Sequence, residues 1–160
     1  YDAKLLKAAV EVNQNQRYLA IAKLQQTLKI LKGKTIGLLG LTFKPDTDDL
    51  RDAPALDLIS ELIRLGAKVK AYDPIINNQN LEITLANNPK ELAQDCDALV
   101  LVTDWQEFLE LDYELLADKM NNPLMIDGRN CLDPRNLEQA GFVYIGIGKS
   151  GQTVQQLITA

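Results

Sequence analysis

Residues 37–56 read GLLGLTFKPDTDDLRDAPAL. The segment starts as an apolar strand pattern, continues through a long polar loop and ends at the start of a helix pattern. The loop carries two cations, Lys44 and Arg51. Loops that follow strands in α/β proteins are where ligands commonly bind. The segment therefore predicts a strand, a loop and a helix in succession, with a ligand site in the loop.

Short apolar segments alternate with amphipathic ones along the rest of the chain. Strands are expected over residues 35–41, 69–72, 98–103, 124–126 and 143–145, and helices over 55–65, 89–94, 113–120 and 134–140. Residues 75–86 are interpreted as a loop with room for a short strand at 81–83, and in the tail after residue 146 only 154–158 suggest a helix. Apolar strands that alternate with helices indicate a parallel sheet with helices on both faces. The predicted fold class is α/β, a Rossmann-like sheet.

One long helix is expected before the sheet, over residues 4–31, with Gly33 as its stop. A stripe with steps of three and four residues runs along Leu6, Val10, Asn13, Arg17, Ala20, Leu24 and Leu31. It is apolar except at Asn13 and Arg17, which interrupt it. Such a helix would be about 40 Å long, more than a small domain covers. We therefore expect a partner surface on it, a second subunit or a missing part of the chain, rather than packing along its own domain. Residues 1–33 are predicted to be a connecting and dimerisation helix, and 34–160 the binding domain.

The mildly acidic composition excludes several classes of partner. The chain has 160 residues, with 17 basic and 22 acidic side chains and a net charge of −5. It therefore lacks the electrostatic footprint of a nucleic-acid-binding protein and has no attraction to an anionic membrane surface. No apolar segment reaches the length of a membrane span, and no signal peptide is visible. We expect a cytoplasmic protein.

The side chains that usually catalyse reactions are scarce. The chain has no histidine, and its two cysteines, Cys96 and Cys131, lack the spacing of a metal site. Two free thiols in a reducing cytoplasm and a disulfide both remain open. Cys131 lies near Arg129, which would lower the pKa of a thiol, but one neighbour does not make a catalytic cysteine. We predict no catalytic residue and no metal site in this chain. Because it starts at Tyr1 without a methionine, we expect an excised piece of a longer protein.

The predicted loops at the carboxyl ends of the strands suggest a site for a diphosphate. The Gly-x-Gly-x-x-Gly turn of a dinucleotide site is absent after the first strand. Lys44 is instead a candidate point charge on a phosphate, beside the flat ring of Phe43. Arg129 follows the fourth strand within Asp127-Gly128-Arg129-Asn130, and parallel strands place both loops at one edge of the sheet. Solvated side chains in ordinary turns remain the alternative for both cations.

Other candidates at this edge have simpler interpretations. Arg51 lies among four aspartates, which would either order the loop and cap the next helix or position the cations for a ligand. Asp73 occupies the place where Rossmann proteins bind a ribose hydroxyl, although a turn before Pro74 explains it. Trp105 and Phe108 would stack on a base or, more simply, pack in the core.

Several segments together resemble the UDP-glucose/GDP-mannose dehydrogenase family over essentially the whole chain. They are Val12-Asn13-Gln14 with Arg17 in the long helix, Lys34 to Leu56, Thr103-Asp104-Trp105 with Glu107-Phe108, and Asp127-Gly128-Arg129. Their order also matches. Thr47 within the Phe43 to Arg51 segment resembles the UDP-glucose 6-dehydrogenases more than the N-acetylhexosamine members. GDP-mannose and UDP-N-acetylhexosamine dehydrogenases of the family, and a stand-alone nucleotide-binding or dimerisation module, are the alternatives.

The resemblance implies an NAD-dependent enzyme that oxidises UDP-glucose to UDP-glucuronate. The family's N-terminal domain binds NAD and carries the catalytic cysteine, and its motifs are absent here. The chain is thus expected to be the central helix and the UDP-sugar-binding domain, inactive alone. By position, Phe43, Lys44 and Arg129 would bind the UDP-sugar, and Arg51 would reach NAD. The family also implies a homodimer through residues 4–31.

Overall fold

In the computed structural model of the chain, the described residues are 18–51, 53–77 and 81–147. They form a sheet in which every strand pair is parallel, in the order β3-β2-β1-β4-β5-β6. The strands are β1 (Thr35–Leu39), β2 (Lys68–Tyr72), β3 (Thr84–Leu85), β4 (Ala98–Leu101), β5 (Leu124–Asp127) and β6 (Val143–Gly146). The helices are residues 18–28, α2 (Pro54–Arg64), α3 (Pro89–Ala93), α4 (Gln106–Leu109), α5 (Tyr113–Lys119) and α6 (Pro134–Gln139). The predicted Rossmann-like α/β class is confirmed.

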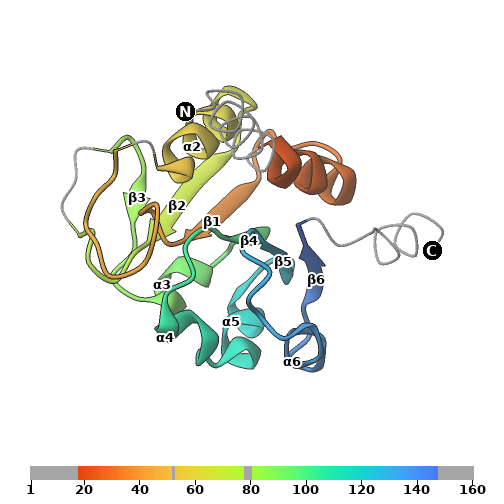
Figure 1. Cartoon of the computed structure of the whole chain (residues 1–160). Coiled ribbons are helices and arrows are strands. Elements are labelled where there is room, and N and C mark those ends of the chain that lie inside the picture. The colour runs from red at the N-terminus through yellow and green to blue at the C-terminus, as the bar shows by residue number, and fades with distance from the viewer. Residues whose placement is uncertain (1–17, 52, 78–80, 148–160) are drawn as a thin grey trace, which may run out of the picture.

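Helices cover both faces of the sheet, as the unbroken apolar strands require (Figure 1). Residues 18–28 and α2 pack on one face, and α3 to α6 pack on the other. Alternate residues of each strand point to opposite faces, so neighbouring strand residues enter different clusters. In β1, for example, Leu38 joins the first cluster and Leu39 the second. The sheet is therefore buried on both sides.

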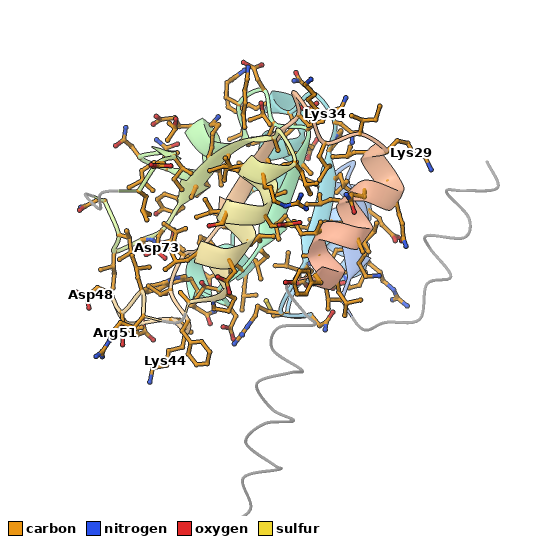
Figure 2. The ribbon with its side chains drawn as sticks, turned by 90° about the horizontal axis from the view of Figure 1, so that it is seen from above. Lys29, Lys34, Lys44, Asp48, Arg51 and Asp73 are labelled. Atoms are coloured by element: carbon orange, nitrogen blue, oxygen red, sulfur yellow. The ribbon has the colours of Figure 1, made fainter. Side chains whose placement is uncertain are left out.

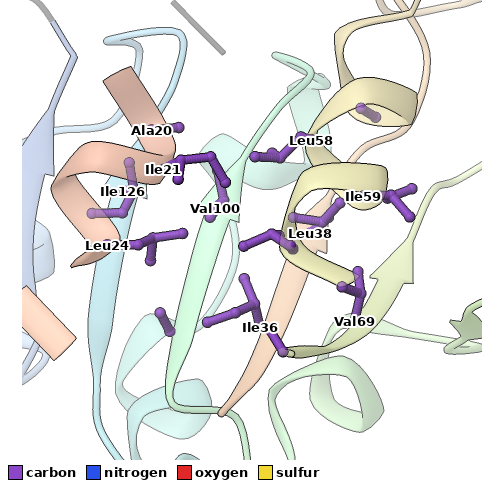
Figure 3. Packing of buried hydrophobic residues seen from close by; sticks show 14 of the residues in the cluster. Ala20, Ile21, Leu24, Ile36, Leu38, Leu58, Ile59, Val69, Val100 and Ile126 are labelled. Atoms are coloured by element: carbon purple, nitrogen blue, oxygen red, sulfur yellow. The ribbon is translucent and has the colours of Figure 1, made fainter. Parts of the chain in front are cut away.

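The described part of the N-terminal helix packs on its own domain. Ala20, Ile21 and Leu24 are buried and face Val100 and Ile126 of the sheet (Figure 3). The expectation that a partner rather than the domain covers the helix is thus wrong for residues 18–28. The predicted stretch 4–17 lies outside the described residues.

This helix also ends earlier than the sequence pattern predicts. The last helical residue is 28, and Lys29 follows with φ of 68°. Leu31 is buried but lies beyond the helix, and Gly33 with φ of 80° belongs to the turn into β1. Its amide donates to the Gly66 carbonyl at 2.9 Å. Gly33 is therefore a turn residue rather than the helix stop.

The other predicted elements are present with small shifts. β1 and β4 end at residues 39 and 101, before the predicted 41 and 103, because the chain there turns into loops held by side chains. The short strand lies at 84–85 instead of 81–83, where it pairs with Lys70 and Ala71. Helix α4 was not predicted because its four residues span barely one turn. The candidate helix at 154–158 lies outside the described residues.

Candidate nucleotide-sugar site

The buried polar side chains of the described residues gather at the carboxyl edge of the sheet. Thr42 follows β1, Asp73 follows β2, Thr103 follows β4, and Asp127 ends β5. A buried polar group costs free energy unless it is hydrogen-bonded. All four make hydrogen bonds to the loops of this edge. This edge is therefore where the fold concentrates its polar contacts.

The loop that carries Phe43 and Lys44 is tied to both neighbouring strands. The Leu41 amide donates to Asp73 Oδ2 at 2.9 Å, and the Thr103 hydroxyl donates to the Thr42 carbonyl at 2.7 Å. The Thr42 hydroxyl in turn donates to the Lys44 carbonyl at 2.9 Å. These three bonds fix the backbone on either side of Phe43. They hold the loop in place although the two side chains are exposed.

Asp73 has a structural role in this arrangement. Its Oδ1 accepts the amides of Ile75 and Ile76 at 2.9 and 3.1 Å, while its Oδ2 accepts Leu41. The carboxylate thus accepts three backbone amides and joins the loops after β1 and β2. The turn interpretation of Asp73 is confirmed, and a ribose contact has no support here.

The turn that carries Arg129 is built around the buried Asp127. Asp127 Oδ1 accepts the Arg129 amide at 3.0 Å, and Oδ2 accepts the Leu132 amide at 2.9 Å. Gly128 donates its amide to the Leu101 carbonyl, and a Cβ on it would lie 2.6 Å from that oxygen. A glycine is needed here because the loop after β5 passes against the end of β4.

Arg129 points toward the loop after β4 and toward a pocket. One guanidinium nitrogen lies 3.2 Å from Asp104 Oδ1, and both side chains are about two-fifths exposed, 37% and 39%. Arg129 also lines an apolar pocket of about 90 Å³ together with Phe43. Pro54 and Leu58 of α2 form another part of its wall, so the N-terminus of that helix borders the pocket. The sequence-predicted Phe43 and Arg129 are thus brought together.

Lys44 and Arg51 lie at the same end of the molecule, opposite Lys29 and Lys34 (Figure 2). Lys44 is exposed next to Phe43 but is not part of the pocket wall. Arg51 is 89% exposed in its side chain and binds Asp49 through two nitrogens at 3.1 and 3.0 Å. Arg51 therefore stands apart from the Phe43–Arg129 pocket.

The Arg51 hydrogen bonds lower the pKa of Asp49 to about 2. Arg51 thus orders its loop, as one of the two interpretations of the aspartate cluster predicts. The expected aspartate cap of the next helix is not found at the N-cap position of α2, where Ala53 makes no side-chain hydrogen bond.

The remaining candidates belong to the core. Trp105 and Phe108 are buried in the cluster under α3 to α6, so the packing interpretation is confirmed. Both thiols are free. Burial raises the pKa of Cys131 to about 11, and the carboxylates of Asp127 and Asp104 add to the rise. The expected lowering by Arg129 is thus outweighed, and Cys131 is a poor nucleophile.

Sequence reasoning missed the side chains that hold the site in place. Thr42, Thr103 and Tyr144 act through hydrogen bonds to residues brought close only by the sheet. A Thr shortly after each of the strands β1 and β4 was the available hint. Within the described part of the chain, no group of three or more acidic or thiol side chains could hold a metal ion, and no helix is long and apolar enough to cross a membrane.

A protein-family model matches most of the domain that carries this site. It is described as the UDP binding domain of the UDP-glucose/GDP-mannose dehydrogenase family, and it covers residues 37–134. The chain belongs to the UDP-glucose/GDP-mannose dehydrogenase family. The matched residues include both loops that form the pocket wall, after β1 and after β5. The family resemblance drawn from the sequence is confirmed.

Relatives and solved structures agree with this family. The UDP-glucose 6-dehydrogenase of Pseudomonas aeruginosa is 38% identical over 160 aligned residues, which cover 93% of this chain and 35% of that protein. TuaD of Bacillus subtilis, also a UDP-glucose 6-dehydrogenase, is 38% identical, with 93% and 33% covered. The structure of a UDP-D-ManNAc dehydrogenase from Pyrococcus horikoshii superposes with a TM-score of 0.78 at 28% identity, covering 92% of this chain and 34% of that one. The chain thus spans about a third of the length of these relatives.

Proposed function

We propose that this chain is the nucleotide-sugar-binding part of an NAD-dependent UDP-glucose 6-dehydrogenase, with the UDP diphosphate held by Lys44 and Arg129 and with Phe43 beside it. The observation that carries the proposal is the pocket lined by Phe43 and Arg129 at the carboxyl edge of the sheet. In open α/β sheets ligands bind at this edge. The proposal is supported by the matching UDP-binding domain model.

The physical basis is a pair of cations on fixed loops. Lys44 and Arg129 follow different strands, β1 and β5, and the backbone of each is held by a partly buried hydrogen bond. Binding an anion there must order the two side chains, but the backbone that carries them is already ordered. The N-terminus of α2 adds its positive dipole end to the same pocket.

Calorimetry with UDP tests the site. Lys44→Ala and Arg129→Ala should each weaken binding by about 1.5–3 kcal/mol, the range for hydrogen bonds to charged groups. Lys34→Ala is the matched control, since it removes the same charge at the opposite end of the molecule (Figure 2). Equal UDP affinity in all variants would refute the assignment of the site.

The proposed identity of the sugar is based on the relatives of this chain. The curated relatives at 38% identity are UDP-glucose 6-dehydrogenases. A second candidate, an N-acetylhexosamine substrate, is favoured by solved structures such as the UDP-D-ManNAc dehydrogenase at 28% identity. GDP-mannose is the remaining family alternative. Competition of UDP-glucose, UDP-N-acetylmannosamine and GDP-mannose for the site separates the three.

We further propose that the chain has no dehydrogenase activity alone. Its two cysteines, Cys96 and Cys131, both have a raised thiol pKa and are therefore poor nucleophiles. A mixture of the chain with NAD and UDP-glucose should form no NADH, measured by absorbance. Steady NADH formation by the purified chain would contradict this.

NAD is proposed to bind mainly outside this chain. The loop after β1 lacks the glycine turn of a dinucleotide site, and its backbone is already tied to Asp73 and Thr103. The described domain therefore does not fit the usual NAD pyrophosphate cradle. Arg51, exposed and ordered by Asp49, is the proposed contact. Arg51→Ala should raise the KM for NAD of the longer enzyme without changing UDP affinity of this chain.

We also propose a homodimer through the helix predicted over residues 4–31, in a cytoplasmic protein. The exposed Tyr18 and Leu19, at 65% and 42%, support an apolar contact there, and two free thiols suit a reducing compartment. Light scattering should give twice the chain mass. Leu19→Asp should shift the protein toward monomer, whereas Gln26→Asp adds the same charge at another exposed helical position and should not.

A further inference from the structure

The hydroxyl of Tyr144 reaches the turn of Arg129 from a neighbouring strand. Tyr144 is 4% exposed, and its hydroxyl donates to Asp127 Oδ2 at 2.7 Å. In the register of β5 and β6, Tyr144 lies beside Met125. Met125 and Asp127 are two residues apart and share a face of the sheet. The phenol therefore extends along that face to the end of β5, where the turn begins.

Asp127 also accepts hydrogen bonds from the backbone of the turn. The same Oδ2 accepts the Leu132 amide, and Oδ1 accepts the Arg129 amide. Between these two amides Asn130 has φ of 53°, a left-handed conformation that asparagine adopts more readily than most residues. The Asp127 carboxylate therefore bonds the amides of Arg129 and Leu132, on both sides of the turn.

The orientation of the Arg129 guanidinium is set by the backbone of this turn and by the ion pair with Asp104. Its nitrogen lies 3.2 Å from Asp104 Oδ1 while the side chain lines the pocket. A turn that reoriented would move Arg129 out of reach of both. The carboxylate that bonds the Arg129 amide is thus itself bonded by a residue in β6.

We propose that Tyr144 is a positioning residue for the diphosphate site, acting through Asp127 on the turn that carries Arg129. The inference rests on the proposed function, since it assumes that Arg129 binds a nucleotide diphosphate. Without the hydroxyl, Oδ2 keeps only the Leu132 amide, and the turn is held less firmly. Binding must then order the turn, which lowers affinity.

The test compares two tyrosines in one cluster. Tyr144→Phe removes the hydroxyl bond to Asp127, whereas Tyr113→Phe removes a similarly buried bond to the Phe108 carbonyl, made at 2.6 Å. Calorimetry with UDP should show affinity about 3- to 10-fold weaker for Tyr144→Phe, the effect of one hydrogen bond. Tyr113→Phe should change it by less than about twofold.

A double-mutant cycle separates positioning from general loss of stability. In an Arg129→Ala background, Tyr144→Phe should have almost no further effect on UDP affinity, because the residue it positions is absent. Amide hydrogen exchange gives a second readout without ligand: Arg129 and Leu132 should exchange faster in Tyr144→Phe and not in Tyr113→Phe.

The outcomes are distinct. UDP binding that is unchanged by Tyr144→Phe, or weakened equally with and without Arg129, overturns the positioning role and leaves the proposed function standing. Unchanged exchange at Arg129 and Leu132 also overturns it. If the unmodified chain does not bind UDP, the proposed site falls and this inference falls with it.

Discussion

Gly40, directly after β1, packs against Thr103 in the loop after β4. Replacing Gly40 by alanine measures how tightly these two loops are packed. A Cβ at this position would lie 2.5 Å from both Cβ and Oγ1 of Thr103 and 2.9 Å from the Thr103 amide nitrogen. Gly40 also has φ of 91°. The substitution therefore adds both backbone strain and crowding.

Gly33 provides a matched control. It has φ of 80°, and a Cβ on it would meet no atom within 4 Å. Each glycine donates its amide to a carbonyl, Gly33 to Gly66 at 2.9 Å and Gly40 to Tyr72 at 2.8 Å. The two substitutions thus share the strain and differ in the crowding.

The magnitudes follow from this comparison. A left-handed conformation costs a non-glycine residue about 1–2 kcal/mol, and the stiffer unfolded chain recovers about 0.4–1 kcal/mol. Gly33→Ala should therefore lower the free energy of unfolding by about 1 kcal/mol. Overpacking adds about 1–3 kcal/mol, so Gly40→Ala should cost about 2–4 kcal/mol in total.

Urea unfolding followed by circular dichroism measures both values. We expect Gly40→Ala to be the more destabilised by about 1–3 kcal/mol, with similar denaturant dependence. Equal losses for the two variants would show that the loops move apart without cost. The close approach of Gly40 to Thr103 would then not help to hold the loop that carries Phe43 and Lys44.

Three further predictions concern single groups. Arg51→Ala should return the pKa of Asp49 from about 2 toward 3.8, as measured by NMR titration, and an unchanged titration would contradict the ion pair. The lowered pKa stabilises the folded state fully above about pH 4, and this contribution is lost as the pH falls from about 4 to 2. Cys96 and Cys131, both with a thiol pKa of about 11, should react slowly with iodoacetamide at pH 7.5, and a rapid phase of labelling would contradict the raised pKa values. Asn88→Ala should lower the free energy of unfolding by about 1 kcal/mol in urea, because its side chain caps α3; no loss would show that the cap is dispensable.

The sequence pattern was sufficient to predict the layers of the fold, a parallel sheet between helices. Apolar segments such as β4, buried at every residue, have no polar side to leave in water, so a parallel sheet covered on both faces was predictable. Element ends were harder. The helical spacing of apolar residues continues to Leu31, but the helix ends at residue 28 because Lys29 adopts a left-handed conformation.

The candidate site was predictable only in part. Phe43 and Arg129 could be placed at one edge because parallel strands end on the same side. The bond between Thr103 and Thr42 joins residues 61 positions apart, and no local pattern encodes it. For Cys131 the nearby Arg129 was visible in the sequence, whereas the burial that raises the pKa of the thiol was not.

The central position of β1 also has a consequence for synthesis of the chain. One edge of β1 pairs with β2, but Ile36 on the other edge pairs with Ala98, and the Thr35 amide bonds Asp97 across 62 positions. At 5–20 residues per second, the ribosome takes roughly 3–12 s to add those residues. During that interval one edge of β1 has no partner strand, and such an edge is a template for pairing with another chain.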